Sequence, residues 1–334
     1  MFFYLGLMLF FLVMSCRRSC SSTKMFLAGI VLFVIMGLKS ETIGNDTPSY
    51  IEFYNRLQRM GTLIDSNSRF EIGYQLLNKI VGLLFEDVQA LFVVVAVICI
   101  GCIMYGCSQY SCNWQYSLFL LVGLRFFYFF LSGLRQSIAV SIIFVSYKYL
   151  NEKKIVKFVL LVLLASSFHL SAIFFLLAWP ISKFKWKKTT IMQVIVIVLG
   201  VYLLFSPILQ IVMRYLPSYY SHYIGSSAFE GNKIANYIGA IIPCTILFFS
   251  YVINYKAKGT IVQTSAEKNI DVNMQKYFLL VSAGISFIAT RASLLDRLVQ
   301  YFWIFAIIAI PNMLFSIKDM RKRLAWYLII IVIC

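Results

Sequence analysis

The sequence predicts an all-α protein, a polytopic transmembrane helical bundle of about twelve spans. Two observations carry this prediction. Hydrophobic residues make up 61% of the 334 residues and charged residues only 13%, against roughly 45–50% and about 25% in soluble domains. Apolar runs long enough to cross a hydrocarbon layer of about 30 Å recur along the whole length. We therefore expect one membrane-embedded domain covering residues 1–334.

Basic residues set the orientation of the helices, because cytoplasmic loops carry an excess of Lys and Arg. Five basic loops, at 15–24, 148–157, 182–188, 255–276 and 318–323, are therefore assigned to the cytoplasm. No basic segment precedes the first apolar run, so we expect it to remain as a helix with its N-terminus outside. The assignment is self-consistent if the chain crosses at 1–14, 25–40, 88–106, 117–132, 133–150, 155–168, 169–181, 189–206, 237–254, 277–290, 296–317 and 324–334. The short pair 155–168 and 169–181 is also compatible with a bent or re-entrant element.

This orientation leaves two long loops outside, 41–87 and 207–236. Within the first, residues 70–85 predict an amphipathic helix that lies on the outer surface instead of crossing. If this helix crossed, the Lys-rich loops would fall on both sides of the membrane. Its apolar stripe consists of Ile72, Leu76, Ile80, Leu83 and Leu84.

Lys and Arg are distributed differently over the two faces. The cytoplasmic loops carry mostly Lys, whereas eight of the eleven other basic residues are Arg, whose planar guanidinium binds phosphate in two places. We expect one outward-facing cavity that holds an anion, because charge buried in a membrane is usually functional. The alternative is structural: Arg291 or Arg297 pairs with Asp296, and Arg125 pairs with a carboxylate on another helix. The expected anion-binding residues are Arg125, Arg135, Arg291 and Arg297, with Arg214 in the second outer loop.

A few polar residues near the outer face are candidates for acid–base chemistry. His169, at the outer end of a predicted span, is either a general base or hydrogen-bond donor for a polar substrate, or a helix-end histidine satisfied by a carbonyl. Asp46 and Glu71 in the first outer loop either orient sugar hydroxyls or act as a base. The Asp46 segment is equally compatible with a turn and helix N-cap before Pro48.

Several functions are excluded by what the sequence lacks. It contains neither a phosphate-binding G-x-x-x-x-G-K-[ST] motif nor an H-E-x-x-H metal motif, and Asp46 has no neighbouring carboxylate. We therefore expect no ATP motor, no cofactor and no metal, so that Arg must neutralise any phosphate. The net charge of +17 reflects cytoplasmic loop charge and does not indicate nucleic-acid binding.

Four motifs occur in an order that resembles a known family. They are Gly44-Asn45-Asp46-Thr47-x-x-Tyr50, Glu71-x-Gly73-Tyr74, Leu134-Arg135-Gln136-x-Ile138-Ala139 and Phe168-His169-x-Ser171-Ala172. This set resembles the EpsG-like branch of the Wzy polysaccharide polymerases over roughly residues 25–180. The Arg-Gln and Phe-His motifs are the more specific pair, and the C-terminal third is not diagnostic by itself.

The resemblance implies a multi-pass enzyme of the bacterial inner membrane whose active site faces the periplasm. Such an enzyme moves a growing O-antigen or exopolysaccharide chain from undecaprenyl pyrophosphate onto a sugar hydroxyl of a new lipid-linked unit. Membrane lipid and a chain-length regulator are the other partners it implies. We expect His169 to activate the acceptor, with Asp46 or Glu71 as rivals, and Arg135 to lead the pyrophosphate contacts. The remaining substrate contacts are expected from Gln136, Tyr50 and Tyr74.

Other classes stay open at this stage. A flippase or other transporter of lipid-linked oligosaccharide also needs an anion-binding cavity, but would be expected to show repeat symmetry and midplane polar groups. A metal-dependent polytopic glycosyltransferase predicts inhibition by a chelator. A membrane acyltransferase would also suit a single histidine in the membrane.

Overall fold

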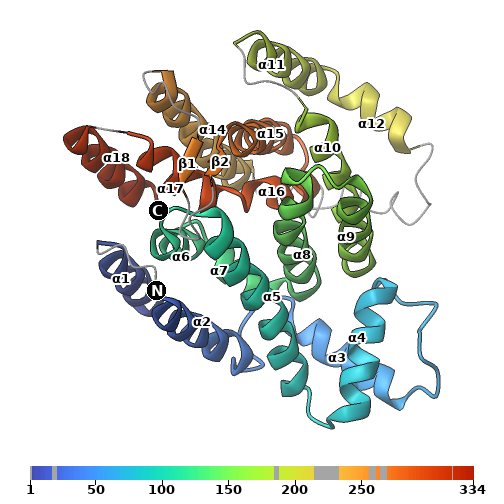
Figure 1. Cartoon of the computed structure of the whole chain (residues 1–334). Helices are drawn as coiled ribbons and strands as arrows, with labels where there is room; N and C mark the ends of the chain where they lie inside the picture. Colours follow the sequence, from blue (N-terminus) through green and yellow to red (C-terminus); the bar gives the residue numbers. More distant parts are fainter. Residues whose placement is uncertain are drawn as a thin grey trace. The chain divides into compact units, whose positions relative to one another are not determined.

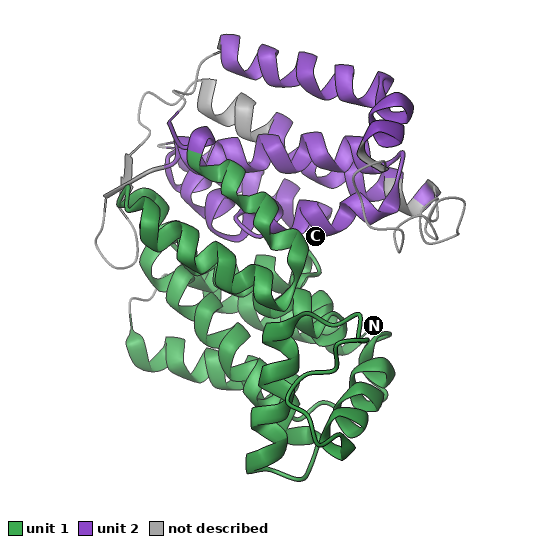
Figure 2. Ribbon diagram, turned by 90° about the vertical axis from the view of Figure 1, so that its right-hand side faces the viewer, with its two compact units in different colours: residues 1–179, 262–270, 334 green, residues 180–261, 271–333 purple. Residues whose placement is uncertain are grey.

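The computed structural model describes residues 2–16, 21–183, 188–213, 233–255, 261–263, 269–317 and 319–334. These residues are predominantly helical, with two three-residue strands, β1 (Ile261–Gln263) and β2 (Asn269–Asp271), paired in a small sheet (Figure 1). The all-α prediction is confirmed. The contacts divide the chain into two compact units, residues 1–179, 262–270 and 334, and residues 180–261 and 271–333 (Figure 2). Each is described here by itself, and a single embedded domain remains a prediction.

The first unit is built around α8, most of whose residues are buried. α8 packs against α5 and α9, α2 packs against α5, and α1 packs against α6. Small and β-branched side chains along α8, such as Ser137, Ala139 and Val140, allow this close approach on several sides. The helices of this unit are α1 (Phe2–Cys16), α2 (Ser22–Gly37), α3 (Thr47–Arg59), α4 (Ile72–Leu84), α5 (Gln89–Tyr110), α6 (Trp114–Gly123), α7 (Phe126–Ser132), α8 (Leu134–Asn151), α9 (Ile155–Phe168) and the 3-10 helix η1 (Leu170–Leu177).

The second unit is organised around α15, which packs against α11, α14 and α16. A buried amide pair joins two of its helices: Nδ2 of Asn312 in α17 donates to Oε1 of Gln275 in α15 at 3.0 Å. The helices begin with α10 (Ala178–Ile181) at the boundary of the units and continue with α11 (Lys188–Leu203), α12 (Phe205–Met213), α14 (Lys233–Tyr255), α15 (Asn273–Ala289), η3 (Ser293–Leu295), α16 (Asp296–Trp303), α17 (Ala306–Phe315) and α18 (Met320–Ile333).

The number of membrane spans differs from the predicted twelve. Among the described residues only α5 is long and apolar enough to cross a membrane alone, and three bent helix pairs bring the number to four if each pair is one span. Shorter apolar helices of 10–17 residues occupy several of the other predicted positions. Helices therefore lie where most spans were predicted, whereas twelve crossings remain a prediction.

Three predicted spans are broken and not continuous. The chain bends by 59° between α6 and α7, by 74° between α11 and α12, and by 48° between the η3–α16 segment and α17. In the first case the break falls at Arg125, which adopts a left-handed backbone conformation with φ +64°. A non-glycine residue in that conformation ends an α-helix, so the predicted span 117–132 consists of two helices that meet at a bend.

The predicted first outer loop folds into a helical pair, α3 and α4, that buries polar groups. Lys79 of α4 is buried and donates from Nζ to the carbonyls of Leu57 and Met60 at 3.0 and 2.9 Å, at the C-terminal end of α3. The predicted apolar stripe of α4 is exposed on the surface of the protein, where Ile72 is 59% and Leu83 71% exposed. The amphipathic helix is confirmed, and the exposed apolar stripe suits contact with lipid.

Candidate active site

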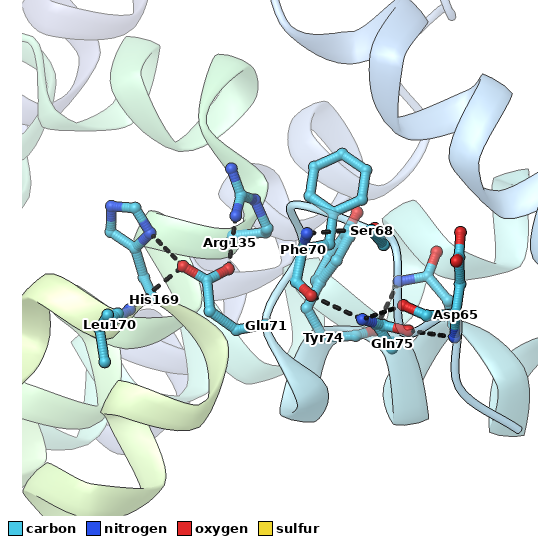
Figure 3. A network of polar contacts seen from close by, with 10 residues as sticks. Asp65, Ser68, Phe70, Glu71, Tyr74, Gln75, Arg135, His169 and Leu170 are labelled. Atoms are coloured by element: carbon cyan, nitrogen blue, oxygen red, sulfur yellow. Dashed lines mark hydrogen bonds and ion pairs between the residues drawn. The ribbon is translucent and has the colours of Figure 1, made fainter. Parts of the chain in front are cut away.

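The side chains of Arg135 and His169, which come from distant parts of the sequence, meet at the carboxylate of Glu71 (Figure 3). Nη1 of Arg135 forms a short ion pair with one carboxylate oxygen. The other oxygen lies 3.1 Å from Nδ1 of His169 and accepts the backbone N–H of Leu170 at 3.2 Å. Figure 3 shows the carboxylate placed between the imidazole and the guanidinium. All three side chains are 10–19% exposed, so they are largely but not completely shielded from the surroundings.

Each of these residues sits at the end of a helix. Glu71 occupies the N-cap position of α4, but its side chain makes no capping bond there and reaches η1 instead. Arg135 stands in the first turn of α8, just after the break at Gly133. His169 is the extended residue, φ −153° and ψ 110°, that separates α9 from η1. Helix ends supply unpaired backbone donors, and Glu71 satisfies one of these, the N–H at the start of η1.

Gly73 explains the spacing of the Glu71-x-Gly73-Tyr74 motif. A Cβ at this position would collide with Ser167, including its backbone carbonyl oxygen at 2.7 Å and carbonyl carbon at 2.9 Å. Only glycine lets the first turn of α4 lie this close to the end of α9. The close approach brings Glu71 within reach of His169, two residues beyond Ser167.

Aromatic rings hold the Arg135 side chain in place. Its guanidinium lies 4.5 Å from the centroid of the Phe70 ring, and Phe70 in turn packs edge-on against Phe53 and Tyr74. Tyr50 interacts electrostatically with Arg135 as well. Burial raises the pKa of Tyr50, partly opposed by the positive charge of Arg135. A guanidinium stacked in this way has a fixed orientation, which a flexible ammonium would lack.

The electrostatic balance keeps Glu71 ionised. Burial alone would raise the pKa of this carboxyl group, but the hydrogen bond from His169 and the charge of Arg135 outweigh it and lower the pKa to about 2. A carboxylate accepts hydrogen bonds and cannot donate them, so Nδ1 of His169 must carry a proton. In the neutral imidazole the basic lone pair is then on Nε2. Glu71 is thus a weak base itself and a fixed acceptor that selects the histidine tautomer.

The Gly44–Thr47 motif has a structural role. Gly44 has φ +99°, and a Cβ there would lie 2.5 Å from the carbonyl oxygen of Leu131, so glycine is required. The buried Lys39 ammonium donates to Ile43 O, Thr47 Oγ1 and Leu131 O at 3.0, 2.8 and 2.6 Å. These bonds fasten the start of α3 to the end of α7, which leads directly into Arg135. Asp46 is exposed at the N-cap of α3 and forms no side-chain capping bond.

The other predicted residues of the first unit are placed as follows. Gln136 follows Arg135 in α8 and is buried, and the Tyr74 ring lies 5.5 Å from that of Tyr50. Arg125 is exposed and its guanidinium lies 5.4 Å from the ring of Tyr128, one turn further along. None of the contacts described for Arg125 reaches Glu71, Arg135 or His169.

The remaining predicted arginines lie elsewhere. Arg291 and Arg297 belong to the second unit, where both are exposed and Arg291 stacks 4.5 Å above the Tyr202 ring. Arg214 lies outside the described residues. Convergence of these arginines with Arg135 in one cavity therefore remains a prediction. The sequence predicted no role for Phe70 or Lys39, and it placed Gly73 in a motif without a structural reason, although Phe70 directly precedes Glu71 and Gly73 lies two residues after it.

Comparison with known proteins identifies the family. A family model described as the EpsG family matches residues 22–334. The curated proteins and the solved structures gave no match. The family match includes residues of both units, with Glu71 and the three residues around it, Phe70, Arg135 and His169. Because it extends over nearly the whole chain, the protein belongs to the EpsG family.

Proposed function

We propose that this protein is a membrane glycosyltransferase that polymerises lipid-linked oligosaccharide repeat units. It transfers the growing chain from undecaprenyl pyrophosphate onto a sugar hydroxyl of a new lipid-linked unit, on the periplasmic face of the inner membrane. The EpsG family is associated with polymerase activity of the glycosyltransferase type. The observation that carries the proposal is the cluster itself: one carboxylate, Glu71, joins a histidine and an arginine.

His169 is the proposed general base. The acceptor hydroxyl oxygen forms a bond to the anomeric carbon of the growing chain and gives its proton to Nε2. The bond from that carbon to the pyrophosphate oxygen breaks, and its electron pair leaves with the pyrophosphate. Glu71 acts as a positioning residue, because it holds the Nδ1 proton and so keeps the accepting lone pair on Nε2. General bases of this kind typically contribute about 10²–10⁴ in rate.

Arg135 is the proposed contact for the leaving pyrophosphate. Its Nη1 is occupied by Glu71, but within the described structure its Nε is buried and donates to no acceptor. An unsatisfied buried donor costs about 1–3 kcal/mol, and a phosphate oxygen of the substrate would satisfy it. Loss of a single donor to a developing negative charge typically costs about 10²–10³ in rate.

The charge of the cluster changes in the direction that favours reaction. With neutral His169, the charges of Glu71 and Arg135 cancel. When His169 accepts the proton, the cluster becomes net positive, while negative charge grows on the departing pyrophosphate. The attraction is therefore stronger in the transition state than in the bound substrate, which is the requirement for catalysis. The proposed reaction uses no metal ion. That the enzyme works without a metal remains a prediction, which a chelator tests.

The test is a gel of surface polysaccharide from cells that lack the gene. The proposal predicts a single repeat unit on the carrier or core, because units arrive but are not joined. A flippase would leave no unit at all, and this result would refute the proposal. Complementation with wild type should restore long chains in the presence of a chelator, whereas His169→Gln should leave the single unit.

A further inference from the structure

An open groove runs along the first unit between α2 and α5, away from the Glu71 cluster. It encloses about 770 Å³. The two helices run antiparallel, as shown by the packing of Gly29 against Met104 and of Gly37 against Ala96. Its lining is mostly apolar and includes Phe33, Ile100 and Gly101, and two further lining residues, Phe26 and Val97, are 68% and 57% exposed.

One end of the groove differs chemically from the rest. Ser22, Tyr105, Ser108, Gln109 and Trp114 line the end where α2 begins and α5 finishes. Tyr and Trp are the residues that favour the headgroup level of a bilayer, since they combine an apolar ring with a polar group. The groove therefore has an apolar body and a polar, aromatic mouth, as an acyl chain with its headgroup requires.

Positive charge adjoins this mouth. The Lys148 ammonium lies 5.9 Å from the Tyr105 ring centroid and interacts with its hydroxyl. Lys24 stands in the first turn of α2, beside the lining residue Met25. Glu152, whose charge also acts on Lys148, is paired with Lys154 at 2.7 Å. No acidic side chain lines the groove along the described residues, so the charge at its mouth favours an anionic headgroup.

The length of the groove matches one leaflet of a bilayer. Its lining extends from Ser22 to Phe33 on α2 and from Val97 to Gln109 on α5, which corresponds to about 17–18 Å at the rise of an α-helix. One leaflet contributes roughly half of the about 30 Å hydrocarbon layer. A polyprenyl chain would extend far beyond the groove, whereas one acyl chain and its headgroup fill it.

We propose that the α2–α5 groove binds one acyl chain of an anionic phospholipid, with the phosphate at the Lys24 and Lys148 end. This site is separate from the proposed catalytic residues and does not depend on the proposed function. The basic loops place its mouth in the cytoplasmic leaflet. A second observation supplies a clean test: Gly101 faces open space, with no atom within 4 Å of a Cβ placed there.

The probe is phosphatidylglycerol with a diazirine in one acyl chain, added to the purified full-length protein in nanodiscs of phosphatidylcholine. We expect photolabelling to concentrate on α2 and α5, and an excess of unlabelled phosphatidylglycerol to compete better than phosphatidylcholine. Labels spread evenly over other exposed apolar helices, such as α1 and α11, would overturn the proposal. Competition by undecaprenyl phosphate in preference to phosphatidylglycerol would also overturn it, because the groove would then be a substrate site.

Two matched glycine variants localise the binding. Gly101→Leu fills the groove and should reduce the labelling of α2 and α5 at least tenfold. Gly6→Leu is the control, because Gly6 is also a helical glycine with no atom within 4 Å of its Cβ position, yet lies in α1 outside the groove. Lys148→Gln should abolish the preference for phosphatidylglycerol over phosphatidylcholine. Wild-type labelling of a Gly101→Leu protein that elutes as a single helical species would refute the proposal, and the labelling map of the wild type decides it if that variant does not fold.

Discussion

Single residues account for the chemistry of the proposed site, and Glu71 has the central role. The sequence identified Glu71, Arg135 and His169 as candidates, but gave them separate functions. Their contact depends on packing between residues 64 and 98 positions apart, which no local pattern encodes. The structure turns Glu71 from a rival base into the group that orients His169.

Arg135→Lys should fail to restore long polysaccharide chains. Lysine keeps the positive charge but loses the planar guanidinium that stacks on Phe70 and the Nε donor proposed for pyrophosphate. We expect the polymerisation rate to fall about 10²–10³-fold, measured as chain length on a gel. The control is Arg59→Lys in α3, where the guanidinium is exposed and bonds only to Asn55 of its own helix among the contacts described. Long chains with Arg135→Lys would remove the guanidinium from the mechanism.

The low pKa of Glu71 predicts a pH-dependent contribution to stability. Folding lowers this pKa from 4.5 to about 2, so the folded state favours the ionised form. The contribution, on the order of 3 kcal/mol, is complete above about pH 4.5 and is lost as the pH falls toward 2. Thermal unfolding in detergent should show an advantage of wild type over Glu71→Gln at about pH 5 that shrinks as the pH falls toward 2. An equal advantage at about pH 3 and pH 5 would contradict this.

At the level of elements, two close approaches place the site. The first turn of α4 lies against the end of α9 at Gly73, and the start of α3 is fastened to the end of α7 by Lys39. The sequence located these helices through apolar runs and an amphipathic stripe. It could not show the approaches, since a glycine in a motif does not reveal which distant backbone it contacts.

Gly73→Ala tests the first approach. The added methyl group would press on the backbone of Ser167, and relief requires α4 to move away from α9, which separates Glu71 from His169. Overpacking of this kind costs about 1–3 kcal/mol, so we expect a lower melting temperature and reduced polymerisation. Gly61→Ala is the control, because a Cβ at Gly61 meets no atom within 4 Å. Full activity and stability of Gly73→Ala would show that the approach is not required.

At the scale of the whole molecule, the sequence predicted membrane embedding and a helical fold, and both the structure and the family agree. It did not predict the bends at Arg125 and elsewhere. A hydropathy pattern is insensitive to them, because a broken helix in a membrane has the same composition as a straight one. The side of the membrane on which each loop lies is still the inference from Lys and Arg.

A pair of Asn→Cys substitutions tests that orientation. Asn67 lies in the predicted first outer loop and Asn151, at the end of α8, in the predicted cytoplasmic loop 148–157, and both are exposed. In intact cells, a membrane-impermeant maleimide should label Asn67→Cys above the level of the parent protein. Asn151→Cys should be labelled only after the membrane is permeabilised. Labelling of Asn151→Cys alone would place the Glu71 cluster on the wrong side for the proposed reaction, and labelling of both would contradict the predicted crossing by α8.

The most direct measurement is a double-mutant comparison of chain elongation by the purified protein in lipid vesicles with lipid-linked repeat units. If Glu71 acts through His169, His169→Gln should slow elongation by at least about a hundredfold, and adding Glu71→Gln should slow it little further. Multiplicative losses would show that the two residues act independently. Wild-type elongation by His169→Gln would contradict the account at its centre.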